Sequence, residues 1–295
     1  AFSVLLEQAI KVSSAPSHLH YLAGKVAIER CEPDHVRRHL EGIQDAAKSR
    51  QVALGLAMLE GRVSDAEELI EAGLTSDVPS EANRMALAAA ARRLDDCVFG
   101  QQDASLSKDI KHYLSKVNVS EPNSDERSVT IVAMSMIQHA LALREGDFEK
   151  AQRLRISLAG IGGLAQPLLQ GMEAKAHLLS AQNANERAKA VQEMQDAIEA
   201  QTNSVRAEGL RLSLVEFLSE TDVEKAKQVF SATVEPQTPS NSATLHRLHA
   251  RWWACKSKLE PNMRRIALRE AITLHRSAGC PRAAKSLESQ LHLLL

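Results

Sequence analysis

The sequence predicts an all-α protein, arranged as an α-solenoid of about eight antiparallel helix pairs. Apolar residues recur at three- and four-residue steps along almost the whole chain, as they do in helices with one buried face. Apolar residues make up 44% of the 295 residues, but aromatic residues make up only 3%. This composition favours Ala and Leu cores between closely stacked helices. Nine prolines and thirteen glycines are too few to interrupt such helices often.

The periodicity predicts sixteen helices, each ended by a short break with turn chemistry. Several breaks place Ser, Asp or Pro where a helix begins and Gly where one ends. In chain order, these breaks are Ser14 to Pro16, Glu32 to Asp34, Gly61, Gly73 to Pro79, Glu121 to Asp125, Gly146, Gly160 to Gly163, Glu235 to Ser240, Glu260-Pro261 and Gly279 to Pro281. The expected helices span 2–14, 17–30, 34–48, 51–60, 64–73, 80–99, 104–117, 126–145, 148–159, 164–181, 185–200, 203–219, 222–233, 242–259, 262–278 and 281–294.

Three breaks share a corner motif, at 61–70, 146–154 and 221–230. Each follows one helical run and opens the next with a small residue, which is typical of the tight corner of an antiparallel helix pair. The corner alanines are Ala66, Ala151, Ala190 and Ala226. Sixteen helices in this length give a mean pitch of about 37 residues per pair, within the range of helical repeat proteins. One pair cannot bury both its faces, so stacked neighbours are expected to complete the core.

The corner motif resembles that of the tetratricopeptide repeat, where a Gly-Asp-Tyr-like turn precedes a helix with a small, closely packed Ala. Gly146, Asp147, Phe148 and Ala151 carry the best match. The resemblance implies a superhelix whose first helices line a groove for a peptide. If the corners set the phase, the helix at 242–259 is one of these groove-lining helices.

The expected solenoid is continuous and has three parts. Residues 1–120 form N-terminal helical repeats, 121–240 central tetratricopeptide-like repeats, and 241–295 a basic C-terminal set. The chain ends on His292 followed by three leucines, whereas repeat arrays normally close with a polar capping helix. Two expectations stay open: the chain is a piece of a longer solenoid, or this end packs on a partner or on its own preceding helix.

No catalytic, cofactor or metal signature is expected in this sequence. The glycine-rich turn at 160–163 lacks the strand and Gly-Lys-Ser/Thr ending of a phosphate-binding loop. The histidine pairs His18/His20 and His246/His249 lack the i, i+4 spacing of a helical zinc site. Cys31, Cys97, Cys255 and Cys280 are widely separated, which favours reduced thiols in an intracellular protein, cytoplasmic or nuclear. The sequence therefore favours a protein that is not an enzyme.

The C-terminal region carries the strongest candidate for partner binding. Residues 245–295 contain ten Lys or Arg against three Glu, whereas the whole chain has a net charge of −1. Two helices present basic residues at i, i+4 and i+11, each set on one helix face. Opposite the first set, an apolar stripe is expected to face the core, and Trp253 falls off this stripe, where it is expected to be exposed. The candidate partner-binding residues are Arg247, Arg251, Lys258, Arg265, Arg269, Arg276 and Trp253.

We expect a non-enzymatic scaffold or adaptor that binds a peptide or a subunit of a larger complex. Arginine forks suit carboxylate and phosphate oxygens, so the expected partner is an acidic or phosphorylated segment. One alternative is a sensor or regulatory solenoid that controls an attached effector or transcription module. Another is a nucleic-acid-binding helical repeat protein. The arginines could instead pair with acidic side chains of the preceding repeats. No run is long enough to insert into a membrane.

Overall fold

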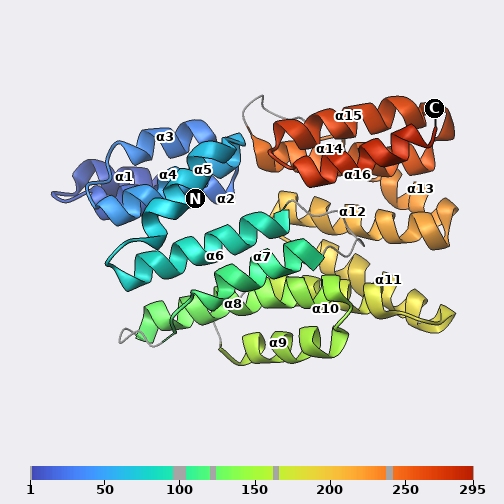
Figure 1. Cartoon of the computed structure of the whole chain (residues 1–295), viewed down its shortest axis with the longest axis horizontal. Coiled ribbons are helices and arrows are strands. Elements are labelled where there is room, and N and C mark those ends of the chain that lie inside the picture. The colour runs from blue at the N-terminus through green and yellow to red at the C-terminus, as the bar shows by residue number, and fades with distance from the viewer. Residues whose placement is uncertain (1, 96–103, 120–123, 162–165, 237–241, 295) are drawn as a thin grey trace.

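The computed structural model describes residues 2–95, 104–119, 124–161, 166–236 and 242–294 (Figure 1). The expectation of an all-α chain is confirmed for these residues, which form helices and no strand. The helices are α1 (Phe2–Val12), α2 (Ser17–Glu29), α3 (Pro33–Leu40), α4 (Ala46–Glu60), α5 (Val63–Leu74), α6 (Pro79–Asp95), α7 (Ala104–Ser115), α8 (Ser124–Glu145), α9 (Phe148–Ile161), α10 (Gln166–Ser180), α11 (Ala184–Glu199), α12 (Ser204–Thr221), α13 (Val223–Ser231), α14 (Ala243–Leu259), α15 (Arg264–Ser277) and α16 (Pro281–His292), with a 3-10 turn at Pro261–Met263. Cys97 and parts of the breaks expected at 121–125, 160–163 and 235–240 lie outside the described residues.

The predicted corners are tight turns in the structure. Gly61 and Gly146 adopt left-handed backbone angles, with φ of 68° and 75°, which glycine accepts without steric cost. At the start of α13, the Asp222 side chain accepts a hydrogen bond from the backbone nitrogen of Lys225. The corner alanines Ala66, Ala151, Ala190 and Ala226 are all buried. Their small side chains allow neighbouring helices to approach closely.

One pair of helix boundaries was predicted wrongly. The helices expected at 34–48 and 51–60 are α3 and α4, and the break lies at 41–45 instead of 49–50. Asp45 ends the break because its carboxylate accepts a hydrogen bond from the backbone nitrogen of Lys48, at 3.0 Å. This N-cap lies three residues before the predicted end of the preceding helix, so α4 begins at Ala46.

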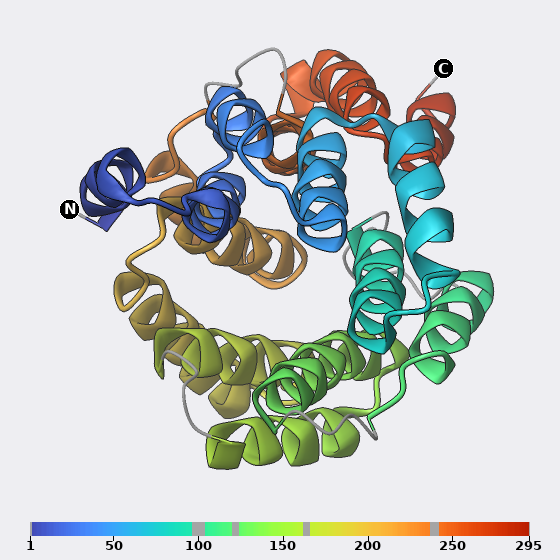
Figure 2. The same cartoon turned by 90° about the vertical axis from the view of Figure 1, so that its left-hand side faces the viewer.

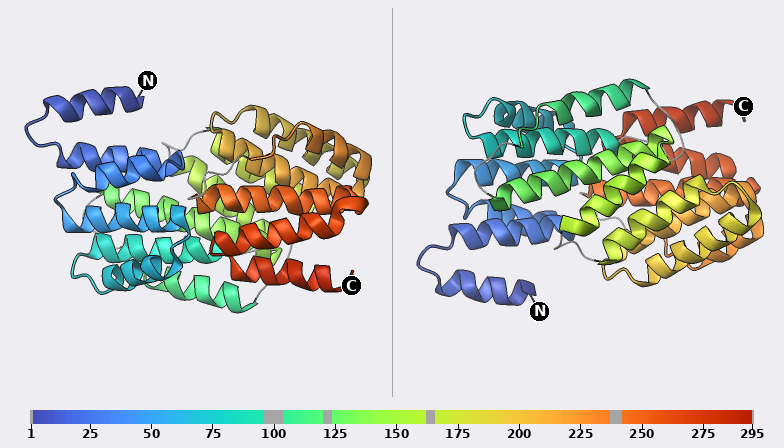
Figure 3. Two further views of the ribbon diagram at one scale, coloured as in Figure 1. Left: turned by 90° about the horizontal axis from the view of Figure 1, so that it is seen from above. Right: turned by 90° about the horizontal axis from the view of Figure 1, so that it is seen from below.

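The helices form an inner and an outer layer. Most sequential neighbours pack against each other, and in addition α2, α4, α6 and α8 contact one another in turn, as do α10, α12 and α14. Most helices therefore run side by side along a common direction (Figure 3). Seen along that direction, they are arranged in a ring around a central space (Figure 2).

The ring closes where its C-terminal helices meet its N-terminal helices. α14 packs on α4, and Leu245 joins the apolar cluster around Tyr21 and Val36. At this seam the backbone of Gly61 lies so close to α15 that an added Cβ would stand 2.7 Å from the carbonyl oxygen of Ser277. A Cβ on Gly279 would stand 2.5 Å from a methyl group of Val63. The two glycines therefore allow the turn between α4 and α5 to come into direct contact with the end of α15.

Candidate functional site

The central space contains a cavity of about 750 Å³, a volume typical of ligand sites in proteins. Its wall comes mainly from the inner helices α8, α10, α12 and α14, with single residues from α6, α9, α15 and α16. Arg206 and Gly146 are exposed lining residues, so the cavity reaches the surface there. Much of the wall is apolar, and includes Leu94, Met136, Leu143, Phe148, Leu168, Met172, Leu179, Val205, Leu210, Leu248 and Leu287.

Positive charge dominates the ionisable groups of this wall. Within the described part of the chain, five cationic side chains and one carboxylate line the cavity. The cations are Arg144, Lys175, Arg206, Arg247 and Arg251, and the carboxylate is Glu216. An excess of positive charge behind low-dielectric walls attracts and concentrates anions.

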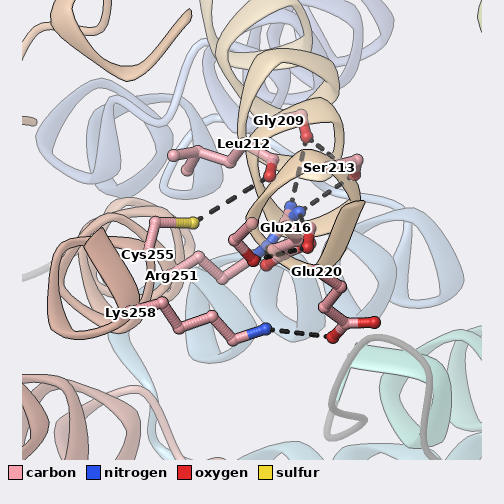
Figure 4. A network of polar contacts seen from close by, with 9 residues as sticks. Gly209, Leu212, Ser213, Glu216, Glu220, Arg251, Cys255 and Lys258 are labelled. Carbon is pink, nitrogen blue, oxygen red and sulfur yellow. Dashed lines mark hydrogen bonds and ion pairs between the residues drawn. The ribbon is translucent and has the colours of Figure 1, made fainter. Parts of the chain in front are cut away.

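Arg251 joins α14 to α12 through a polar network (Figure 4). Its Nε and Nη2 atoms donate to the two carboxylate oxygens of Glu216 at 3.0 and 2.8 Å, and Nη2 also donates to Ser213 Oγ at 3.0 Å. Although burial alone lowers the pKa of Arg251, Glu216 raises it above its ordinary value. A bidentate pair of this kind fixes both side chains. Arg251 therefore links α14 to α12 at the cavity wall, and the carboxylate of Glu216 balances the positive charge of Arg251.

Lys175 extends from α10 into the same charged environment. Burial, followed by the positive charges of Arg251 and Arg144, lowers the pKa of Lys175 to about 8, against the opposing effect of Glu216. The Arg144 guanidinium is held by donation from Nη2 to the carbonyl oxygen of Leu94 at 2.8 Å. At pH 7, Lys175 is still mostly protonated, so it contributes a positive charge to the cavity.

Two histidines in the wall are buried and neutral. His139 on α8 and His275 on α15 are 3% and 9% exposed. Burial lowers the pKa of each to about 4, assisted by Lys175 for His139 and by Arg251 for His275. The Nε2 atom of His139 and the Nδ1 atom of His275 are buried without a hydrogen-bond partner. Such atoms are costly in an apolar interior, and both belong to residues that border the cavity.

The structure separates the predicted partner-binding residues into two groups. Arg247 and Arg251 line the cavity, so α14 does face the inside of the ring. Lys258, on the same helix, is exposed and lies 3.3 Å from Glu220 of α12 (Figure 4). Arg265, Arg269 and Arg276 are exposed on α15 and are not among the cavity-lining residues. Arg276 pairs with Glu288 at 2.6 Å.

The expected exposure of Trp253 is wrong. Trp253 is partly buried, because its ring packs edge-on against Trp252 with centroids 5.2 Å apart. Its indole Nε1 donates to His249 Nε2 at 3.0 Å. Trp253 also borders the apolar cluster that joins α15 to α16, so it contributes to packing between helix pairs.

Sequence reasoning missed several polar cavity residues, among them His139, Arg144, Lys175 and Glu216. These four lie on three different helices, so no local motif contains them. A weak signal was nevertheless present in the spacing of His139, Lys175, Glu216 and Arg251, which are separated by 36, 41 and 35 residues. These steps are close to the pitch of about 37 residues that the sequence predicts for a helix pair.

Comparisons with protein-family models, curated proteins and solved structures found no match. In the described ranges no helix is long and apolar enough to cross a membrane. Of the four cysteines, Cys31, Cys255 and Cys280 are described, and these three are buried and carry no assigned disulfide. Burial, followed by the charge of Glu216, raises the pKa of the Cys255 thiol well above its ordinary value. Cys255 therefore stays protonated near pH 7 and is a poor nucleophile.

Proposed function

We propose that this chain is a tetratricopeptide-like solenoid that acts as a non-enzymatic scaffold and binds an acidic or phosphorylated peptide segment of a partner protein. The observation that carries the proposal is the cavity inside the ring, where five cations face one carboxylate. Inner-helix grooves of helical repeats are extended binding surfaces. Charge-assisted hydrogen bonds from Arg and Lys are suited to carboxylate and phosphate oxygens.

The arrangement of polar groups supports binding over catalysis. The one carboxylate of the described cavity wall, Glu216, accepts two hydrogen bonds from Arg251, so both of its oxygens are already engaged. The apolar wall beside the cations suits a segment that combines acidic and apolar side chains. The exposed lining residues Arg206 and Gly146 provide a route for such a segment to enter.

A regulatory solenoid with a small anionic ligand is a second candidate. The observation that favours it is the volume of about 750 Å³, which also matches sites for single small molecules. Cys31, Cys255 and Cys280, which carry no assigned disulfide, are compatible with an intracellular setting for either function.

The test compares Arg247, which lines the cavity, with Arg269 on the outer helix α15. Fluorescence anisotropy measures the affinity of the protein for labelled Glu-rich peptides and for matched peptides that carry Gln in place of Glu. We expect the acidic peptides to bind preferentially and to lose affinity with rising salt. Arg247→Gln is expected to weaken this binding by about tenfold or more, since a hydrogen bond to a charged group contributes roughly 1.5–3 kcal/mol.

Arg269→Gln on the outer helix α15 is the matched control and is expected to leave affinity unchanged. Melting curves for both variants check that the fold is intact. Equal binding of acidic and neutral peptides contradicts the proposed function. A loss in Arg269→Gln as large as that in Arg247→Gln would move the site to the outside of the ring.

A further inference from the structure

We infer that the cavity recognises a phosphoryl group on its peptide, held by a cationic pole made of Arg144, Lys175 and Arg251 with Glu216. This inference rests on the proposed function and specifies which anion the site selects. The four residues come from α8, α10, α12 and α14, so the pole exists only when these four inner helices are assembled.

The charge of the pole matches a phosphate monoester better than a carboxylate. Glu216 balances Arg251 through their bidentate pair, so the four groups together carry a net charge of +2. A phosphoserine carries about −1.5 to −2 at pH 7, whereas a Glu side chain carries −1. The phosphoryl group therefore neutralises the pole, and a single carboxylate leaves it positive.

Mutual repulsion among these cations favours the binding of a strongly charged anion. Lys175 is partly buried, and desolvation together with the positive charges of Arg251 and Arg144 depresses its pKa. Glu216 opposes this repulsion, but its two carboxylate oxygens already accept hydrogen bonds from Arg251. A bound dianion offsets the repulsion between Lys175 and its neighbours.

His139 supplies the second, independent indication of a ligand. Its Nε2 atom is buried without a partner, and its ring is close enough to Lys175 for the lysine charge to depress the histidine pKa. A neutral imidazole can donate one N–H bond. The three oxygens of a phosphoryl group accept several bonds, enough for Lys175, Arg144 and His139 together.

Apolar side chains border the cationic pole and indicate what flanks the phosphorylated residue. Met136 and Leu143 lie on α8, and Leu168, Met172 and Leu179 lie on α10. These helices also carry His139, Arg144 and Lys175. The preferred segment therefore places apolar residues beside the phosphoryl group, so that they cover this part of the wall.

Three oriented peptide libraries test the inference directly. All have randomised flanking positions, and the fixed central residue is serine, phosphoserine or glutamate. Binding to the full chain is measured by anisotropy, with inorganic phosphate as a competitor. We expect the phosphoserine pool to bind at least about tenfold more tightly than the glutamate pool, with apolar residues enriched beside the phosphoserine.

Lys175→Gln removes one charge of the pole and is expected to erase the advantage of phosphoserine over glutamate. Arg265→Gln, on the exposed face of α15, is its control and is expected to keep that advantage. If Lys175→Gln fails to fold, the comparison of pools on the unaltered protein still decides the question. Equal affinity for phosphoserine and glutamate, both above serine, overturns the phosphoryl inference and leaves the proposed function standing.

Two other outcomes count against the inference. If inorganic phosphate binds but no phosphopeptide pool exceeds the serine pool, the site takes a free anion and not a peptide. If no charged pool exceeds the serine pool and phosphate does not bind, the proposed function fails together with the inference.

Discussion

At the residue scale, the cavity wall combines costly groups that a folded core normally avoids. His139 and His275 are buried with unsatisfied ring nitrogens, and the partly buried Lys175 lies close enough to Arg251 and Arg144 for their charges to lower its pKa. Each of these reduces stability. Their occurrence around one cavity is what a binding site requires, since a ligand that satisfies them regains that free energy.

The two histidines predict acid sensitivity. Their pKa values are about 4 in the folded protein, below the ordinary 6.5, so the unfolded chain binds more protons between these values. The free energy of unfolding therefore falls as pH falls from 6.5 through 4, by up to about 3 kcal/mol per histidine. We expect His139→Gln combined with His275→Gln to flatten the dependence of urea-unfolding stability on pH between 6.5 and 5.

The exposed His292 provides the control, because His292→Gln is expected to retain the full pH dependence. A double variant that loses stability with acid as steeply as the unaltered protein would show that His139 and His275 are not neutral in the folded state.

At the element scale, the sequence predicted the corners better than the helix ends. Gly61, Gly146 and the corner alanines could be identified because left-handed turns and close helix packing limit the allowed residues. The break at 41–45 was missed because Val36, Leu40 and Ile43 keep a helical spacing up to it. The N-cap at Asp45 overrides that spacing, and its effect depends on a single hydrogen bond.

Alanine substitution is expected to have opposite effects on stability at Gly61, which lies at the seam between α4 and α15, and at Gly209 inside α12. Gly61→Ala is expected to destabilise the protein by more than about 1–2 kcal/mol, the cost of a left-handed non-glycine residue, because its Cβ also collides with the carbonyl oxygen of Ser277. Gly209→Ala, inside α12, has nothing within 4 Å of its Cβ. It is expected to stabilise the protein by roughly 0.5–1 kcal/mol.

Urea unfolding measures both glycine variants. A loss in Gly61→Ala of no more than about 1–2 kcal/mol would mean that the seam is open in solution, because an open seam removes the collision with Ser277 and leaves only the cost of the left-handed backbone.

At the scale of the whole molecule, sequence reasoning placed α14 on the inside but did not predict closure of the ring. Arg247 and Arg251 were found because they share one helix face. Lys175, Arg144 and His139 were not, since their proximity to Arg251 depends on how successive inner helices stack. The contact between α4 and α14 joins segments about 200 residues apart, a separation that local periodicity does not report.

Hydrogen exchange with and without an acidic phosphopeptide tests the central claim, that the inside of the ring is the binding site. Exchange protection reports local opening, so a ligand in the cavity slows exchange in the helices that enclose it. We predict added protection in α8, α10, α12 and α14, with no change in the exposed turn of α15 around Arg265 and Arg269. Protection confined to α15, with the four inner helices unchanged, would contradict the account.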